Sequence, residues 1–211
     1  MNPTSETKRT FWVVLAIALV YSFCYRIVPG WTIPNLAPIG ALAFYCGYAS
    51  NRLVFSLIPF ALMAITDTVL RFTVGYPAIP SVYVCMFAYS LLGIVGANRN
   101  WGSRITLLVT GSLFFFVVTN FDNWLMSRVP ADQIGGASYL VQPSAIYTFE
   151  IKYADNFMGL LANYAMALGF LAKTILSDVG FTAVLALVSL SLAPRFALQK
   201  IRVRNRRLNS N

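Results

Sequence analysis

Residues 53–72 have the sequence LVFSLIPFALMAITDTVLRF, which is apolar for nearly its whole length. A hydrocarbon core of about 30 Å needs roughly 20 apolar residues of helix to cross it. Asp67 and Arg71 lie near the end of this run and are four positions apart, so on a helix they share one face and can pair. This stretch therefore predicts a membrane-spanning helix that carries charged side chains.

The composition of the whole chain agrees with that prediction. Its 211 residues are 58% hydrophobic and 11% charged, whereas soluble domains usually carry about 25% charged residues. The mean hydropathy is +0.66. These values exclude a disordered chain, a coiled coil and an ordinary soluble enzyme, and the length suits one domain.

Five further apolar runs predict spans at residues 11–28, 38–49, 81–97, 105–126 and 174–192. Lys173 and Asp178 interrupt the apolar stretch 157–193, so we expect a separate short helix over 157–171 that lies on or dips into the membrane. Residues 127–156 are polar, contain proline and glycine, and are predicted to form an external loop. The expected fold is an all-α membrane protein with six transmembrane helices in a single bundle and an extra short interfacial or re-entrant helix before the last span. The expected divisions are a cytoplasmic segment 1–10, a transmembrane domain 11–194 and a basic cytoplasmic tail 195–211.

The distribution of basic residues sets the expected orientation, because inner loops of membrane proteins are enriched in Lys and Arg. With a cytoplasmic N-terminus, 11 of the 16 basic residues lie inside: Lys8, Arg9, Arg52, Arg99, Arg104, Arg195, Lys200, Arg202, Arg204, Arg206 and Arg207. The other five lie outside. A crossing by 157–171 would move the C-terminal tail outside, so six spans are favoured. We expect a multi-pass protein of the inner (plasma) membrane with both termini cytoplasmic.

The net charge of +9 has two interpretations, a nucleic-acid-binding patch or a membrane-proximal anchor. Six basic residues lie in the tail 195–207, directly after the last predicted span. Basic segments in that position attract the anionic lipids of the inner leaflet. The predicted partner of the tail is therefore the membrane lipid and not nucleic acid.

The chain lacks the residues that most catalytic sites require. There is no histidine, and Cys24, Cys46 and Cys85 each stand alone in an apolar run, which excludes histidine triads, histidine-ligated metals and CxxC sites. Residues 167–174 lack the glycines of a phosphate-binding loop. We expect no enzyme, no cofactor and no metal site.

The acidic residues suggest a binding site instead. Six of the seven acidic residues fall on the outer half of this topology, and ionisable groups at membrane depth tend to face a cavity or a partner. We expect Asp67 and Asp178 to face the bundle interior, with Arg26 or Arg71 close enough to neutralise at least one. The alternative is that these residues only cap helix ends and extend their polar groups to the membrane–water interface. The candidate substrate-binding residues are Arg26, Asn35, Asp67, Arg71, Asn120, Asp122, Trp124 and Asp178.

Three motifs carry a resemblance to known families: 33-IPNLAPIGALA-43 with the following aspartate in Ile65-Thr66-Asp67, 118-VTNFDNW-124, and 173-KTILSDVGFTA-183. The first resembles the substrate-binding S components of energy-coupling factor (ECF) vitamin transporters. All three are more similar still to an uncharacterised family of small bacterial membrane proteins with an N-x-x-P-I-G-A-L-A motif. The resemblance covers roughly residues 11–193.

The S-component resemblance implies six helices, a vitamin-like ligand captured from outside, and an ECF-type transmembrane partner with ATPases. S components often carry Ala-x-x-x-Ala in their first helix for contact with that partner. Here Val20 breaks the pattern, and Ala18-x-x-x-Ser22 is the nearest substitute. Two other functions remain open on the sequence alone, a self-sufficient channel or permease and a structural membrane protein without a ligand. The ligand itself is not named by any motif.

Overall fold

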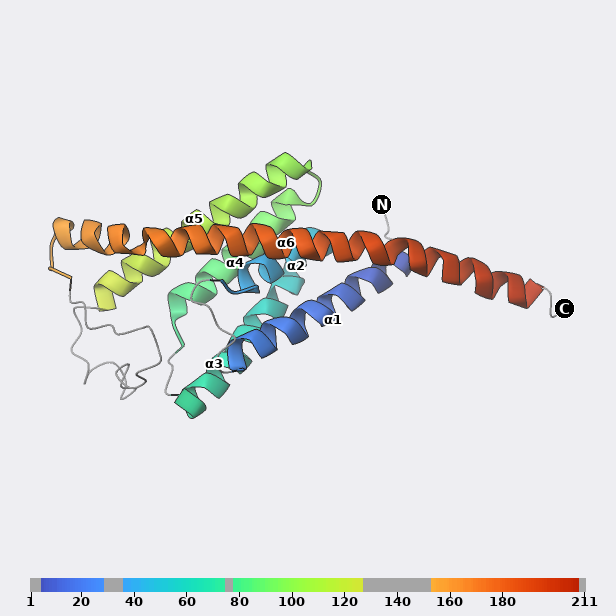
Figure 1. Ribbon diagram of the computed structural model, residues 1–211, viewed down its shortest axis with the longest axis horizontal. Helices are drawn as coiled ribbons and strands as arrows, with labels where there is room; N and C mark the ends of the chain where they lie inside the picture. Colours follow the sequence, from blue (N-terminus) through green and yellow to red (C-terminus); the bar gives the residue numbers. More distant parts are fainter. Residues whose placement is uncertain (1–4, 29–35, 75–77, 127–152, 209–211) are drawn as a thin grey trace.

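A computed structural model describes residues 5–28, 36–74, 78–126 and 153–208 of the chain. These residues form six α-helices and one short 3-10 helix, with no strand among them (Figure 1). The all-helical class is therefore confirmed. The elements are α1 (Ser5–Ile27), α2 (Ile39–Ser50), η1 (Leu53–Ser56), α3 (Leu57–Val74), α4 (Pro80–Gly96), α5 (Trp101–Met126) and α6 (Phe157–Leu208).

Helix length separates the elements into two classes. Four helical stretches are long and apolar enough to cross a membrane, namely Arg9–Ile27, Leu53–Thr73, Trp101–Met126 and Phe157–Leu192. The other two, α2 and α4, are apolar but have only 12 and 17 residues, or about 18 and 26 Å at 1.5 Å per residue. Several membrane-crossing helices indicate an integral membrane protein.

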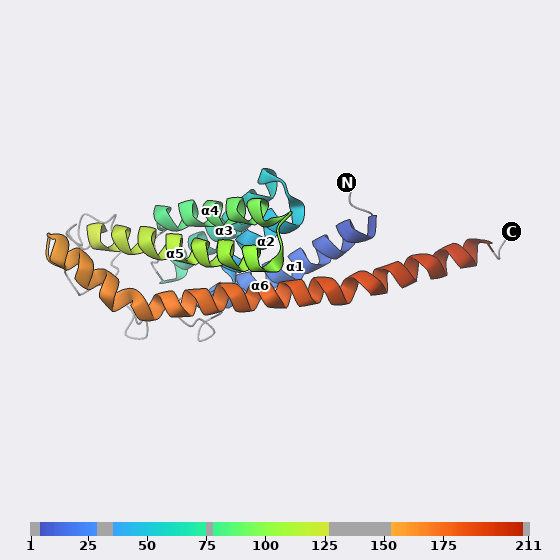
Figure 2. The same ribbon diagram turned by 90° about the horizontal axis from the view of Figure 1, so that it is seen from above.

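Helix α2 lies at the centre of the bundle. It contacts each of the other five α-helices, and these contact one another in a closed ring in the order α1, α3, α4, α5, α6 and back to α1. Every residue from Ile39 to Gly47 is buried, as expected for a helix that is apolar on all sides. Figure 2 shows α2 between α4 and α6. The core of the protein is therefore built around a short inner helix.

Glycines allow α2 and α4 to approach until their backbones touch. A Cβ atom on Gly47 would overlap the carbonyl oxygen of Ser90, and one on Gly93 would overlap that of Phe44. In the same contact, the Ser90 hydroxyl donates to the carbonyl oxygen of Ala43 at 3.1 Å. Small residues at a helix contact let the two backbones approach closely, and Gly47 and Gly93 do so here.

The predicted short helix 157–171 is wrong as a separate element, because α6 is one continuous helix from Phe157 to Leu208. Its 52 residues correspond to about 78 Å, and Figure 1 shows it running the length of the molecule. Lys173 and Asp178 lower the local hydropathy, which suggested a break, but they leave the backbone hydrogen bonds of the helix intact. Lys173 Nζ lies 5.7 Å from the ring centre of Phe170, and hydroxyl groups of other helices hold Asp178. The same helix continues through the predicted boundary at residue 194.

Candidate functional site

A buried ion pair joins α1 to α3. Arg26, in the last turn of α1, donates to Oδ1 of Asp67 in α3. The Asp67 side chain is 4% exposed and that of Arg26 is 13% exposed. The hydroxyl of Tyr83 in α4 donates to the other carboxylate oxygen at 2.7 Å. We call Arg26, Asp67 and Tyr83 the ion-pair group.

The Arg26 guanidinium keeps hydrogen-bonding capacity in this arrangement. A guanidinium has five N–H donors and no acceptor. Within the described residues it donates to Asp67 and to the sulfur of Met63, and a thioether is a weak acceptor. The remaining N–H groups are suited to an oxygen of a carboxylate or carbonyl group.

The prediction that Arg26 or Arg71 neutralises at least one aspartate is confirmed for Arg26 with Asp67, whereas Arg71, which shares a helix face with Asp67, does not pair with it. Arg71 is exposed, and the salt bridge of Asp67 is formed with Arg26. Both oxygens of Asp67 are already engaged inside the bundle, by Arg26 and Tyr83. A partner that is itself partly buried is screened less by solvent than an exposed one, so the contact from α1 prevails over the local one.

A second polar group lies deeper in the bundle. Asp178 of α6 is 2% exposed and accepts hydrogen bonds from the hydroxyls of Tyr89 in α4 and Ser112 in α5, the latter at 2.7 Å. Gly40 of α2 lies so close that a Cβ atom there would overlap Oδ1 of Asp178. We call Asp178, Tyr89, Ser112 and Gly40 the aspartate group, and it joins four helices.

A third group holds the end of α5. Ser81 of α4 donates to Asp122 at 2.7 Å, and the Asn123 amide donates to Asn163 of α6 at 2.9 Å. Asn163 in turn donates to the carbonyl oxygen of Asn120 at 2.6 Å. The Trp124 indole donates to the carbonyl oxygen of Ala154 at 3.2 Å. The candidate residues of α5 therefore tie α5 to α4, to α6 and to the segment before α6.

The candidate residues thus form three groups and not one. The prediction that Asp67 and Asp178 face the bundle interior is confirmed by their burial and by their partners on other helices. Each belongs to a different group, however, and Arg71 belongs to none. Asn35 lies outside the described residues.

Helix α4 is the element common to all three groups. It supplies Ser81, Tyr83 and Tyr89, one hydroxyl to each group. None of these three residues is among the candidate residues named from the sequence, and sequence analysis also missed Ser112 and Asn163 as partners. The available signal was a polar side chain inside a predicted span, since a buried carboxylate needs hydroxyl or amide donors from its neighbours.

The described residues hold no cluster of three histidine, cysteine, aspartate or glutamate side chains that could bind a metal ion. Among the side chains of the three groups, the Arg26 guanidinium has the largest number of charged N–H donors.

Comparison with known proteins finds one family, and that family has no assigned function. A model described as a family of unknown function, DUF6580, matches residues 5–199. The chain belongs to this family. No curated protein and no solved structure gives a significant match. The DUF6580 match includes every residue of the ion-pair group and the aspartate group, so these interior polar contacts lie within the family's extent.

Proposed function

We propose that this DUF6580 protein captures a small vitamin-like nutrient at the outer face of the plasma membrane, as the substrate-binding subunit of a membrane transporter. In this proposal the six α-helices all cross or enter the membrane and both termini are cytoplasmic. The 11-to-5 distribution of basic residues supports that orientation.

One observation carries the proposal: among the described residues, the Arg26 guanidinium has more N–H donors than acceptors, and it lies next to Asp67 and Tyr83 inside a helical ring. Removing an ionisable pair from water is costly, and a membrane protein gains nothing in stability from it over an apolar contact. A binding role explains why the charge is kept. Asp67 holds one nitrogen of the guanidinium, and in this proposal the other donors bind a ligand oxygen.

The expected ligand chemistry follows from those donors. Arginine binds a carboxylate in a planar, two-point contact, and the neighbouring aromatic rings of Tyr83 and Phe60 have centroids 4.8 Å apart. A small molecule that combines an anionic or carbonyl oxygen with an apolar or aromatic body fits both features. The S-component resemblance adds an ECF-type membrane subunit with ATPases as the proposed energising partner.

Mass spectrometry of small molecules that co-purify with the protein tests the proposal. We expect the wild-type chain to retain a carboxylate- or carbonyl-bearing compound, and the double variant Arg26→Gln, Asp67→Asn to lose it. The double variant keeps the site neutral, so it avoids leaving an unpaired buried charge. Arg71→Gln is the matched control, because Arg71 is exposed on α3, and it is expected to retain the compound.

Two results would contradict the proposal. Retention of the compound by the double variant would place the ligand elsewhere. A wild-type protein that purifies empty and conducts solute across proteoliposomes on its own would favour the channel or permease.

A further inference from the structure

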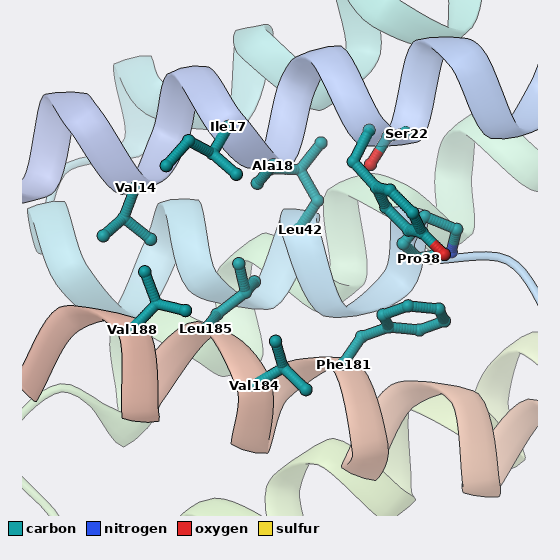
Figure 3. Close-up of a pocket in the computed structure, with 11 residues that line it drawn as sticks. Val14, Ile17, Ala18, Ser22, Pro38, Leu42, Phe181, Val184, Leu185 and Val188 are labelled. Carbon is teal, nitrogen blue, oxygen red and sulfur yellow. The ribbon is translucent and has the colours of Figure 1, made fainter. Parts of the chain in front are cut away.

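An apolar groove runs between α1 and α6, with α2 as its floor (Figure 3). Its volume is about 320 Å³. Val14 and Ala18 of α1 line one side, Val184 and Val188 of α6 line the other, and Leu42 of α2 lies at the bottom. The groove shares no residue with the ion-pair group or the aspartate group and does not depend on the proposed function.

The groove opens toward the outside of the bundle. Ile17 and Val184 at its rim are 54% and 53% exposed, whereas Ala18 and Leu42 inside it are buried. In a membrane, exposed apolar side chains at mid-helix face the lipid tails. The groove is therefore a lateral opening into the hydrocarbon.

The dimensions of the groove suit a single acyl chain better than a helix. From Val14 to Ser22, which both line the groove, α1 rises by about 12 Å. A helix that spans about 30 Å of hydrocarbon is longer than the groove and could only cover it. An extended hydrocarbon chain has no backbone polar groups to satisfy and can lie along this short apolar lining.

Basic residues are concentrated toward one end of the groove. Beyond Val188, helix α6 continues to Leu208, and residues 195–207 contain six basic residues, while no acidic residue follows Asp178. The N-terminal end of α1, with Arg9, lies at the same end of the molecule as the C-terminal part of α6 (Figure 1). The basic ends of both groove-forming helices thus lie on one side of it.

We propose that the groove binds one acyl chain of an anionic phospholipid whose headgroup lies at the basic ends of α1 and α6. The apolar lining holds the chain, and the basic residues of the helix ends select the negative headgroup. The lipid chain fills the groove that α1 and α6 form over Leu42 of α2.

Native mass spectrometry of the full chain tests this inference. The protein is reconstituted in vesicles with equal amounts of phosphatidylglycerol and phosphatidylcholine, then extracted in detergent. We expect phosphatidylglycerol adducts to exceed phosphatidylcholine adducts at least fivefold, and Val184→Trp, which fills the groove, to lower them at least fivefold. Leu187→Trp is the control, since Leu187 is 65% exposed on α6 and does not line the groove.

Should Val184→Trp not fold, Ile17→Trp on the opposite rim replaces it with the same expected loss. Equal retention of the two lipids, or undiminished retention by the groove-filling variants, overturns the proposal. So does a dimer that Val184→Trp dissociates, because the occupant would then be a second copy of the chain.

Discussion

The carboxylate of Asp178 lies directly against Gly40, so that α2 and α6 meet where one residue has no side chain and the other is charged. Gly40 is thus required by space, since any Cβ atom at this position would overlap Oδ1 of Asp178. At the same place, the hydroxyls of Tyr89 in α4 and Ser112 in α5 donate hydrogen bonds to the Asp178 carboxylate.

Gly40→Ala is expected to destabilise the protein, because the added methyl group must displace the Asp178 carboxylate from its hydroxyl partners. Overpacking of this kind typically costs about 1–3 kcal/mol. Thermal unfolding in detergent, followed by circular dichroism, measures the change. Gly169→Ala is the control: a Cβ atom there has nothing within 4 Å, so its melting temperature is expected to stay the same or rise. Equal effects of the two substitutions would contradict this account of the contact.

Asp178 and Tyr89 are expected to be energetically coupled. Asp178→Ala leaves the Tyr89 hydroxyl without its acceptor and takes one of two acceptors from the Ser112 hydroxyl, which also donates to the carbonyl oxygen of Leu108, and a buried unsatisfied group costs about 1–3 kcal/mol. Tyr89→Phe removes one of those donors, so the double variant should lose less than the sum of the two single variants. A double-mutant cycle on unfolding free energies measures the coupling. Strict additivity would show that the hydrogen bond contributes nothing.

Local sequence patterns predicted the helices well and their partners poorly. The apolar runs at 38–49 and 81–97 correspond to α2 (Ile39–Ser50) and α4 (Pro80–Gly96) within one residue at each end, because a change in polarity or a proline bounds each run. The continuity of α6 was not predictable from hydropathy. A charged residue lowers the hydropathy of a window, yet it leaves the helical backbone intact when another helix supplies its partner.

The choice between Arg71 and Arg26 as the partner of Asp67 shows the same limit. The i, i+4 spacing of Asp67 and Arg71 is visible in the sequence, whereas Arg26 is 41 positions away. The packing of α1 on α3 decides between them, and that contact is a property of the assembled ring. Sequence analysis therefore found the charged residues but not how they divide into groups.

Breaking the ion pair from one side is expected to cost more than removing it. Asp67→Asn leaves the Arg26 charge without its counter-ion, and breaking a buried pair in this way costs about 3–5 kcal/mol. The double variant Arg26→Gln, Asp67→Asn should recover part of that loss, because no charge stays unpaired. Unfolding in detergent measures both. Arg71→Gln should change stability by less than about 0.5 kcal/mol, as an exposed substitution does. A double variant less stable than Asp67→Asn would show that Arg26 has a further partner in the bundle.

The orientation of the chain in the membrane can be checked with two single cysteines. In a Cys24→Ser background the remaining cysteines, Cys46 and Cys85, are buried and should not react. Asn98 lies in the turn between α4 and α5, and Asp155 lies just before α6; both are exposed. With a cytoplasmic N-terminus, each passage through α1 to α5 alternates sides, so the α4–α5 turn is inside and the segment before α6 is outside. A membrane-impermeant maleimide should therefore label Asp155→Cys in intact cells and Asn98→Cys only after permeabilisation. Labelling of Asn98→Cys in intact cells would reverse the orientation, place the basic end of α6 on the outer surface, and remove the support that the charge distribution gives to capture from outside.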